Sequence, residues 1–389
     1  MKTKITHISA ITTWSPHKNE LITIKDVDVL IEDDKISAID PKDLGADEEI
    51  DADGALITPG FVDSHTHPVF FGNRVEEFSQ RIDGKSYEEI ANSGGGILSS
   101  IQNIRNVSED KLFVDSLERV NYFLSHGTTT IEAKSGYGLS TEDELKSLRV
   151  IKRLNEVSKL DIIPTFMGAH AFPPEYEDKH DDYVDLICGE MIPAVVNEKL
   201  AEYCDVFCEK GYFSVEDCRQ ILQTAQKHGM KVRLHADEFV DSGAAELGAE
   251  LGAISADHLM AVSDVGIKAM AEKGVIATLL PGTTLFLGKS NYAQGRKIID
   301  MGCDVALASD FNPGSCTIQS MPLLISLVCL YCGLSIEEAF KAATWNGARA
   351  LNREKELGAV SESYQADLLF WKLNEINEIP YWMGSDRIL

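Results

Sequence analysis

Hydrophobic residues follow two different patterns along this chain. From Lys4 to about Ala55, short runs of apolar and β-branched residues alternate with Asp, Asn and Pro, and no helix-length periodicity separates them. The runs predict strands at Ile5–Ile8, Leu21–Ile24, Val27–Ile31 and Lys35–Ile39. This part of the chain is therefore typical of a small β domain.

After Pro59 the pattern changes to strand, loop and helix in repeated order. Apolar runs predict eight strands, at Leu56–His65, Thr128–Lys134, Ile162–His170, Val206–Phe213, Lys231–Ala236, Ala253–Leu259, Val275–Leu280 and Val305–Asp310. Helical periodicity lies between them, for example at Leu112–Leu124, Glu144–Leu154, Val215–Ala225 and Val265–Lys273. Such alternation predicts an α/β fold with a (β/α)8 TIM-type barrel, whose active site forms at the carboxyl ends of the strands.

The end of the chain returns to short strands at Gly358–Trp371, which we expect to pair with the amino-terminal strands. This predicts one composite β domain, made of residues 1–55 and 355–389, and a barrel of residues 56–354. The final segment, Pro380–Leu389, contains no obvious closing strand.

Chemically useful side chains lie at the predicted strand ends: His65, His67, His170, His235, His258 and Asp310. Residues i and i+2 of an extended chain face the same side, so His65 and His67 can present two imidazoles to one point. A chance His-x-His is the alternative, since short motifs match often. Five of the ten histidines at one rim of a barrel favour a metal site instead.

The composition limits the class of partner. A net charge of −26 disfavours nucleic acids and anionic membranes, which are bound mainly by Lys and Arg, and fits a small-molecule enzyme. The amino-terminal sequence has no signal-peptide core, and the apolar run Pro322–Leu334 is too short to span a bilayer and predicts a buried helix. Cys329 and Cys332 in that run read as reduced core residues, which favours the cytoplasm.

Several stretches resemble the metal-dependent amidohydrolase superfamily. The first is Pro59-Gly-Phe-Val-Asp-Ser-His65-Thr-His67, the superfamily's ending of the first barrel strand. The others are Gly94-Gly-Gly-Ile-Leu, Gly127-Thr-Thr-Thr, Lys134-Ser-Gly-Tyr137-Gly, Thr165-Phe-Met-Gly-Ala-His170, Pro173-Pro-Glu-Tyr176, His235-Ala-Asp-Glu238, Ser255-Ala-Asp-His258, Leu280-Pro-Gly-Thr-Thr284 and Ser309-Asp-Phe-Asn-Pro-Gly-Ser315. Within the superfamily they are most similar to the enzymes that open the imidazolone ring during histidine degradation.

This resemblance implies one zinc or iron ion per chain, held by His65, His67, His235 and Asp310, with the metal-bound water as nucleophile. Asp310 can also accept a proton from that water, and His258 can polarise the carbonyl or relay the proton. The resemblance implies that Glu238 is the acid/base residue. Strand alternation alone would place Asp237, not Glu238, on the same face as His235.

The implied substrate, 4-imidazolone-5-propanoate, carries a carboxylate. Arg74 is the matching cation, because a guanidinium can hold a carboxylate through two hydrogen bonds; a solvated surface arginine is the alternative. Tyr137 and His170 match substrate-contacting residues, with purely structural roles as the alternative. The loop residues Asn312, Gly314 and Ser315 match contacts to substrate or product.

Three alternatives remain open at this stage. Some relatives hold two metals through a carboxylated lysine at the end of the fourth strand, where this chain has Glu209 and Lys210. The same fold and metal could serve a deaminase of guanine or cytosine, although Arg74 favours a substrate with a carboxylate. A non-enzymatic scaffold would have lost metal ligands, and none is missing here. A homodimer is implied by the resemblance alone.

Overall fold

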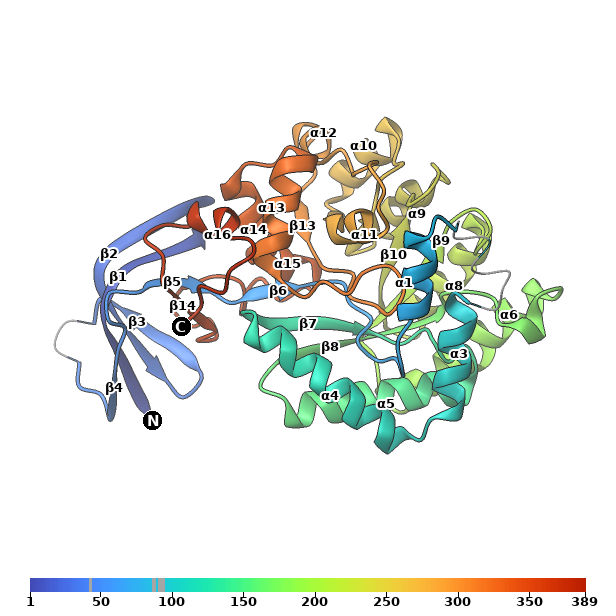
Figure 1. Cartoon of the computed structure of the whole chain (residues 1–389), viewed down its shortest axis with the longest axis horizontal. Helices are drawn as coiled ribbons and strands as arrows, with labels where there is room; N and C mark the ends of the chain where they lie inside the picture. The colour runs from blue at the N-terminus through green and yellow to red at the C-terminus, as the bar shows by residue number, and fades with distance from the viewer. Residues whose placement is uncertain (42–43, 86–88, 90–94) are drawn as a thin grey trace.

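The computed structural model describes residues 1–41, 44–85, 89 and 95–389, so the motif residue Gly94 lies outside the described residues. Two sheets organise this part of the chain. A small sheet contains both amino-terminal and carboxyl-terminal strands, and an eight-stranded parallel sheet is surrounded by helices. In Figure 1 the small sheet lies to the left of the barrel, and α1 lies on the opposite side.

The parallel sheet is the predicted barrel. Its strands are β6 (Phe61–Asp63), β7 (Thr128–Lys134), β8 (Asp161–Ala169), β9 (Tyr203–Cys208), β10 (Lys231–Ala236), β11 (Ser255–His258), β12 (Ile276–Leu279) and β13 (Val305–Leu307). Each strand pairs in parallel with the next in chain order, and a bridge between Thr66 and Phe311 joins the last strand's end to the first. The (β/α)8 prediction is confirmed.

The first predicted strand, Leu56–His65, is wrong as a single element. It is divided between β5 (Leu56–Pro59) of the small sheet and β6 of the barrel. The partner changes at Gly60, whose N–H donates to the Asp367 carbonyl, whereas the next N–H donates to Gly127. A Cβ on Gly60 would lie 2.2 Å from Thr129 Oγ1, so only glycine allows the chain to approach β7 this closely.

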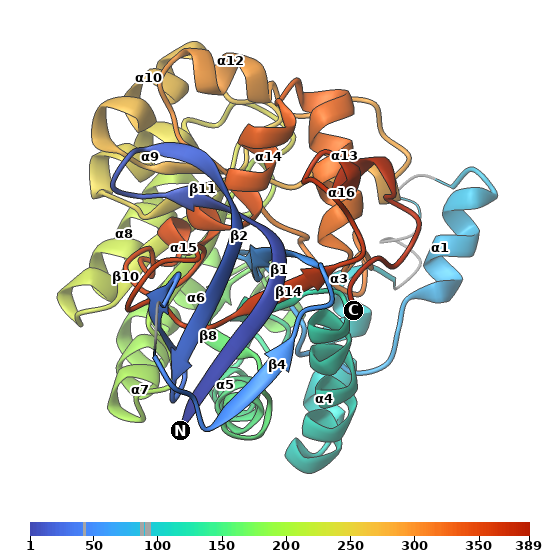
Figure 2. The same cartoon turned by 90° about the vertical axis from the view of Figure 1, so that its left-hand side faces the viewer.

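The small sheet is built from both parts of the chain, as predicted. Its strands are β1 (Lys2–Ser15), β2 (Glu20–Glu32), β3 (Lys35–Ile39), β4 (Glu48–Asp51), β5 and β14 (Leu368–Trp371). They follow the order β14-β5-β1-β2-β3, with β4 beside β1, and Figure 2 shows this sheet in front of the barrel. The division of the chain at residues 55 and 354 stays a prediction.

One predicted turn in the small sheet is wrong. The segments Leu21–Ile24 and Val27–Ile31 belong to a single strand, β2, which pairs with β1 across an irregularity between Ile5 and Ile8. His7 and Asp26 both have positive φ there, +54° and +53°. The polar residues at this point therefore produce a bulge within a strand pair, not a reversal of the chain.

The helices lie mainly between successive barrel strands. They are α1 (Val75–Ile82), α3 (Ile97–Asn106), α4 (Glu109–Ser125), α5 (Thr141–Val157), η1 (Pro174–Tyr176), α6 (His180–Leu186), the π-helical turn η2 (Ile187–Met191), α7 (Ile192–Asn197), α8 (Val215–Lys227), α9 (Ala244–Leu251), α10 (Asp264–Lys273), α11 (Pro281–Phe286), α12 (Gly295–Asp300), α13 (Met321–Cys332), α14 (Ile336–Ala343), α15 (Trp345–Ala350) and α16 (Glu378–Tyr381). All four predicted helices are present, and α13 is the helix predicted in the apolar run. It is buried on one side only, because Leu330 and Tyr331 are exposed.

Local sequence explains where many of these helices begin. A serine side chain accepts a backbone N–H three residues later at the start of α4, α5, α8, α10 and α14.

Across residues 1–41, 44–85, 89 and 95–389, no helix combines the length and the apolarity needed to cross a bilayer. All eight cysteines are free thiols.

Candidate metal and substrate site

The two histidines of the His-x-His motif are fixed by backbone hydrogen bonds at the closure of the barrel. The His67 N–H donates to the Phe311 carbonyl at 2.8 Å, and the Asp310 N–H donates to the His65 carbonyl at 3.0 Å. Thr66, between the histidines, forms the bridge to Phe311. The end of the last strand is thereby held beside the end of the first, which brings Asp310 to both imidazoles.

Five predicted residues converge at this rim. One ligand atom from each of His65, His67 and Asp310 lies within 4.8 Å of the others, and the same holds for His65, His235 and His258. The Nε2 atoms of His65 and His67 are each 3.6 Å from Asp310 Oδ1. Every member is almost completely buried. The structure therefore brings together the four predicted ligands and His258.

The electrostatics of this cluster suit a cation. Burial is the main cause that holds the pKa values of His65, His67 and His258 well below the ordinary value, so these rings are neutral and carry lone pairs. His65 Nε2 is buried and makes no hydrogen bond within the described part of the chain. Neutral imidazoles with one carboxylate are ligands that zinc and iron accept. The donor set fits such an ion.

Asp310 combines two useful properties. Burial raises its pKa to about 6, against the opposing effect of a hydrogen bond from the Thr283 hydroxyl. That hydroxyl donates to Oδ2 at 2.6 Å, which leaves Oδ1 facing the histidines. A positive φ of +53° turns Asp310 out of the preceding strand. Its carboxylate is thus both a candidate ligand and a candidate proton acceptor.

Glu238, not Asp237, faces the cavity. Asp237 follows the end of β10 with a φ of +49°, and its carboxylate accepts N–H groups of Ser242 and Ala245 at the start of α9. Strand alternation fails here because the strand has already ended. Glu238 Oε2 lies 3.8 Å from His258 Nδ1. Burial, and then the nearby Asp310, raise the pKa of Glu238 to about 8, which leaves it protonated at neutral pH.

A cavity of about 810 Å³ opens above these groups. It is lined by His67, Arg74, Arg81, Lys85, Ile97, Tyr137, His170, Phe207, Tyr212, His235, Glu238, Phe239, His258, Leu287, Lys289, Asp310, Asn312, Gly314 and Ser315. Every residue predicted to contact the substrate is in this lining. Four cations, Arg74, Arg81, Lys85 and Lys289, line the cavity of a chain with net charge −26.

Arg74 lies against two other parts of the site. Its Nε and Nη2 donate to Glu77 Oε2 at 2.9 and 2.6 Å. A Cβ added to Gly314 would lie 2.1 Å from Arg74 Nη1, so the guanidinium rests directly on that glycine. Glycine at position 314 therefore makes room for Arg74, and the carboxylate of Glu77 already occupies one edge of the guanidinium.

Tyr137 and His170 form an aromatic wall beside His67. The ring centroids of His67 and His170 are 5.1 Å apart, and Tyr137 is 5.2 Å from His170. His170 Nδ1 is 2.9 Å from the Gly136 carbonyl, so Nδ1 carries the proton and Nε2 keeps its lone pair. Burial lowers the pKa of His170 to about 3, which keeps the ring neutral.

The loop after Asp310 is organised by Asn312. Its Oδ1 accepts the N–H groups of Gly314 and Ser315 at 2.8 and 2.7 Å, and its Nδ2 donates to Ser315 Oγ and to the Asp310 carbonyl. These hydrogen bonds use the amide within the loop itself. Asn312 thus shapes the wall of the cavity in addition to lining it.

The end of the fourth barrel strand carries Glu209 and Lys210, the residues considered for a second metal ion. Glu209 Oε1 accepts the Lys210 N–H, and Glu209 Oε2 accepts the Phe239 N–H, both at 2.8 Å. The Lys210 residue itself is exposed. Both carboxylate oxygens of Glu209 thus serve backbone amides, and the geometry gives no support to a bridged pair of ions.

The chain is similar to proteins of one known family. The sequence model of the amidohydrolase family matches residues 56–388. The imidazolonepropionase of Clostridium tetani is 48% identical over 382 residues, covering 95% of this chain and 90% of that protein. The chain belongs to the imidazolonepropionases, a branch of the amidohydrolase family. Imidazolonepropionases of Bacteroides fragilis and a Geobacillus species are 49% and 46% identical, over 87% and 95% of this chain and 81% and 89% of their own lengths.

Solved structures share the fold of this imidazolonepropionase-family chain at low identity. A guanine deaminase from C. acetobutylicum with bound guanine has a TM-score of 0.73 and 16% identity, covering 100% of this chain and 98% of that one. An adenosine deaminase from Xanthomonas campestris with bound zinc has a TM-score of 0.70 and 17% identity, with 98% and 88% coverage. These similarities establish the barrel architecture.

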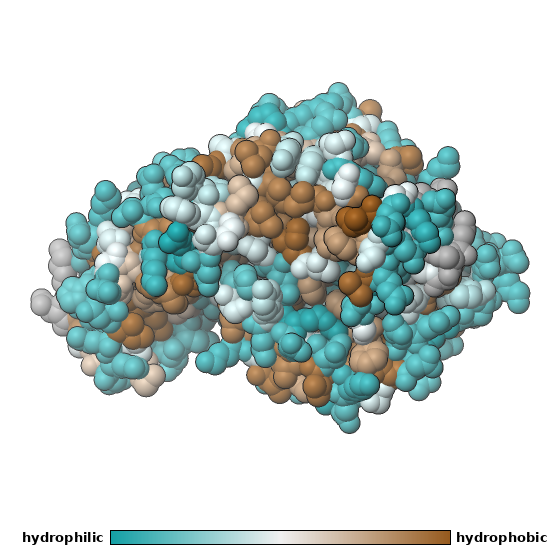
Figure 3. Space-filling view, viewed as in Figure 1, coloured by the Kyte–Doolittle hydropathy of each residue, from teal (hydrophilic) through white to brown (hydrophobic). Residues whose placement is uncertain are grey.

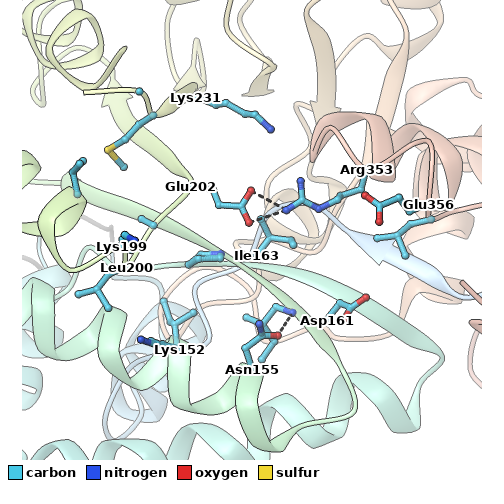
Figure 4. Close-up of a pocket in the computed structure, with 18 of the residues that line it drawn as sticks. Lys152, Asn155, Asp161, Ile163, Lys199, Leu200, Glu202, Lys231, Arg353 and Glu356 are labelled. Atoms are coloured by element: carbon cyan, nitrogen blue, oxygen red, sulfur yellow. Dashed lines mark hydrogen bonds and ion pairs between the residues drawn. The ribbon is translucent and has the colours of Figure 1, made fainter. Parts of the chain in front are cut away.

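A second cavity, of about 690 Å³, lies at the amino ends of β8, β9 and β10. Figure 4 shows that Glu202 faces Arg353 there, and the Arg353 Nη2 donates to both Glu202 oxygens at 2.7 and 2.8 Å. This cavity contains none of the metal-ligand candidates. In this member of the imidazolonepropionase family, the convergent chemistry lies at the carboxyl-terminal rim, as barrel architecture predicts.

Sequence reasoning missed the charged residues below that rim. Glu132, Lys134, Asp205, Arg233 and Asp257 are fully buried inside the barrel. A charged residue inside a predicted barrel strand is a signal that could have identified them, because an unpaired charge is too costly to bury. Glu132 and Lys134 have this pattern in Thr128–Lys134, and Arg233 has it in Lys231–Ala236.

Proposed function

We propose that this protein hydrolyses the ring amide of 4-imidazolone-5-propanoate to N-formimidoyl-L-glutamate, a step of histidine degradation. Identities of 43–49% to imidazolonepropionases support the reaction. The observation that carries the proposal at this site is the convergence of four imidazoles and the Asp310 carboxylate at the base of a cation-lined cavity. Water adds to the amide carbon, the carbon–nitrogen bond breaks, and the departing nitrogen takes a proton.

We propose that His65, His67, His235 and Asp310 hold one zinc or iron ion. When bound, such an ion supplies Lewis acidity and lowers the pKa of a coordinated water. The contacts of Glu209 with backbone amides support a single ion. The choice between zinc and iron is not fixed by the ligand types, since both metals accept imidazole and carboxylate.

Two carboxyl groups, those of Asp310 and Glu238, each carry out one of the two proton transfers. Asp310, with an ionisable carboxylate beside His65 and His67, accepts a proton from the attacking water. Glu238, protonated at neutral pH, donates a proton to the ring nitrogen as it leaves. His258, 3.8 Å from Glu238, is placed to donate a hydrogen bond to the carbonyl oxygen that gains charge.

The remaining wall residues orient the substrate. Arg74 holds the propionate carboxylate, which competes with Glu77 for the guanidinium. His170 accepts a ring N–H through Nε2, and Tyr137 packs beside it. The loop Asn312–Ser315 closes the wall under Arg74, with Gly314 leaving the space that the guanidinium needs. Arg81, Lys85 and Lys289 make the cavity attractive to an anion.

We also propose a cytoplasmic homodimer that binds neither nucleic acid nor membrane. Eight free cysteines support a reducing compartment, and the net charge of −26 opposes binding to polyanions. Leu330 and Tyr331 on α13 are 64% and 56% exposed, and Figure 3 shows apolar surface over the α13 region. Such exposed apolar residues support a contact between subunits.

The test is turnover of freshly generated 4-imidazolone-5-propanoate by metal-replete protein, followed as ring opening. Guanine and cytosine serve as control substrates, because neither carries a carboxylate for Arg74. Ring opening of the imidazolone without release of ammonia from either base is the expected result. Deamination of a base with no ring opening would overturn the proposal.

A further inference from the structure

A network of buried charges lies directly below the candidate metal site. Its members are Glu132 and Lys134 on β7, Asp205 on β9, Arg233 on β10 and Asp257 on β11, all with 0% exposure. The Lys134 ammonium donates to Glu132 Oε1 and Asp205 Oδ2, both at 2.6 Å. Arg233 Nη2 donates to Asp257 Oδ2 at 2.8 Å. Three carboxylates thus share two cations in the barrel interior.

Two of these carboxylates reach up to candidate metal ligands. Asp257 Oδ2 is 2.7 Å from His65 Nδ1, and Asp205 Oδ1 is 3.1 Å from His235 Nδ1. The shortest contacts form two chains, Arg233 to Asp257 to His65 and Lys134 to Asp205 to His235. Arg233 also links them, because its Nε lies 3.8 Å from Asp205 Oδ2. Each chain runs from a cation through a carboxylate to one imidazole.

The carboxylate beside each histidine determines which ring nitrogen carries the proton. A carboxylate accepts a hydrogen bond, so the histidine Nδ1 carries the proton, and the neutral ring then keeps its lone pair on Nε2. His65 Nε2 faces Asp310 Oδ1 at 3.6 Å and has no hydrogen-bond partner among the described residues. The carboxylates therefore select the tautomer and the ring orientation that present Nε2 to an ion.

The cations are needed because these carboxylates are deeply buried. A carboxylate inside a barrel is costly unless it is paired and hydrogen-bonded. Lys134 and Arg233 supply that pairing, and Glu132 also accepts the Thr66 N–H through Oε2 at 3.2 Å, between the two motif histidines. His67 differs from His65 and His235, because its Nδ1 has no hydrogen-bond partner in the described chain.

We propose that Asp205 and Asp257 are positioning residues for metal binding, acting through His235 and His65, and that Lys134 and Arg233 fix both carboxylates in place. This inference rests on the metal site proposed above. The buried charges thereby have a function although none of them is one of the four proposed metal ligands. The two chains make His65 and His235 preorganised ligands, whereas His67 is held only by its backbone and its neighbours.

The test is a titration of Zn²⁺, and separately Co²⁺, into chelator-treated full-length protein, with a competing chelator to define the dissociation constant. Asp205→Asn and Asp257→Asn keep the side-chain shape and remove the charge. Each is expected to weaken metal binding about 10–100-fold and to change the visible spectrum of bound Co²⁺. The matched control is Asp304→Asn, which removes a carboxylate that pairs with Lys341 and Arg349 away from the site; its affinity should stay within about twofold.

A second arm asks whether Asp205 acts through its histidine. In a His235→Ala background, titrated with Zn²⁺ without competing chelator up to concentrations that load the weakened site, Asp205→Asn should change the metal affinity by less than about twofold. Equal weakening in both backgrounds, or affinities of both Asn variants within about twofold of wild type, overturns the positioning role. If one variant does not fold, the other decides, because each aspartate contacts a different histidine. A wild-type protein that binds neither Zn²⁺ nor Co²⁺ instead overturns the proposed metal site.

Discussion

The two ends of the barrel differ in whether their polar side chains have hydrogen-bond partners. At the carboxyl-terminal rim, His258 has two buried ring nitrogens without hydrogen-bond partners among the described residues, and Asp237, His258 and Asp310 have positive φ. At the amino-terminal end, Arg353 and Glu202 satisfy each other and are partly exposed. Unsatisfied groups and left-handed backbone cost stability. At the carboxyl-terminal rim both features fall on His258 and its neighbours in the cluster of imidazoles and carboxylates, which marks this end of the barrel as the one arranged for chemistry.

The largest effect is expected from the ligand positions. His65→Ala or Asp310→Ala should abolish detectable ring opening and deplete bound metal, because each removes one donor from the same cluster. Metal content per chain and turnover are the measurements. The control is Asp304→Ala, which lies just before β13 whereas Asp310 lies beyond its end, and should keep both metal and activity. Full turnover in either ligand variant would contradict the conclusion that the reaction takes place at the carboxyl-terminal rim.

Glu238→Gln should lower kcat about 10²–10⁴-fold, because the departing nitrogen loses its proton donor. In the wild type, kcat/KM should fall as pH rises through the Glu238 pKa of about 8, since the carboxyl group then loses the proton it donates. The variant should lack this descending limb. Asp237→Asn is the neighbouring control and should keep the limb while losing stability, because it caps α9. An unchanged limb in Glu238→Gln would assign that ionisation elsewhere.

Arg74→Met should raise KM about 10–100-fold with a smaller change in kcat, because it removes a charge-assisted contact to the substrate carboxylate. Gly314→Ala should act in the same direction, since the added methyl group overlaps the guanidinium. Steady-state kinetics measure both. Arg149→Met, which breaks an exposed pair with Glu198, is the control with unchanged KM. An unchanged KM in Arg74→Met would remove its role as the carboxylate-binding residue.

The smallest effect is expected at the opposite end. Arg353→Met should lower the free energy of unfolding by about 0–1 kcal/mol, because its pair with Glu202 is partly exposed and screened by water. Activity should stay within about twofold. Chemical denaturation and turnover measure the two quantities. A large loss of activity would show that the amino-terminal cavity takes part in function.

Most of the architecture could be predicted because barrel strands and helices leave strong local patterns. The active site of such a barrel forms at the carboxyl ends of its strands. Searching the predicted strand ends was therefore enough to identify His65, His67, His235, His258 and Asp310. The division of Leu56–His65 could not be predicted, because it depends on Gly60 changing partners between two sheets. Likewise, the bulge at His7 and Asp26 arises from strand pairing, which local propensity does not encode.

The direction of a side chain just after a strand ends is the second feature that could not be predicted from the sequence. Alternation favoured Asp237, and only the left-handed turn after Ala236 places Glu238 in the cavity. The pairing of Arg74 with Glu77, three residues later, and the space left by Gly314 come from contacts between loops. The network of Lys134 and Arg233 with Asp205 and Asp257 joins four strands, so no single segment reveals it.

The most direct test of the central claim is the metal content per chain, measured by elemental analysis together with imidazolone turnover. Both quantities are followed before chelation, after chelation and after metal is restored. We expect about one zinc or iron ion per chain, with turnover that disappears on chelation and returns in proportion to bound metal. Full turnover in metal-stripped protein would contradict it.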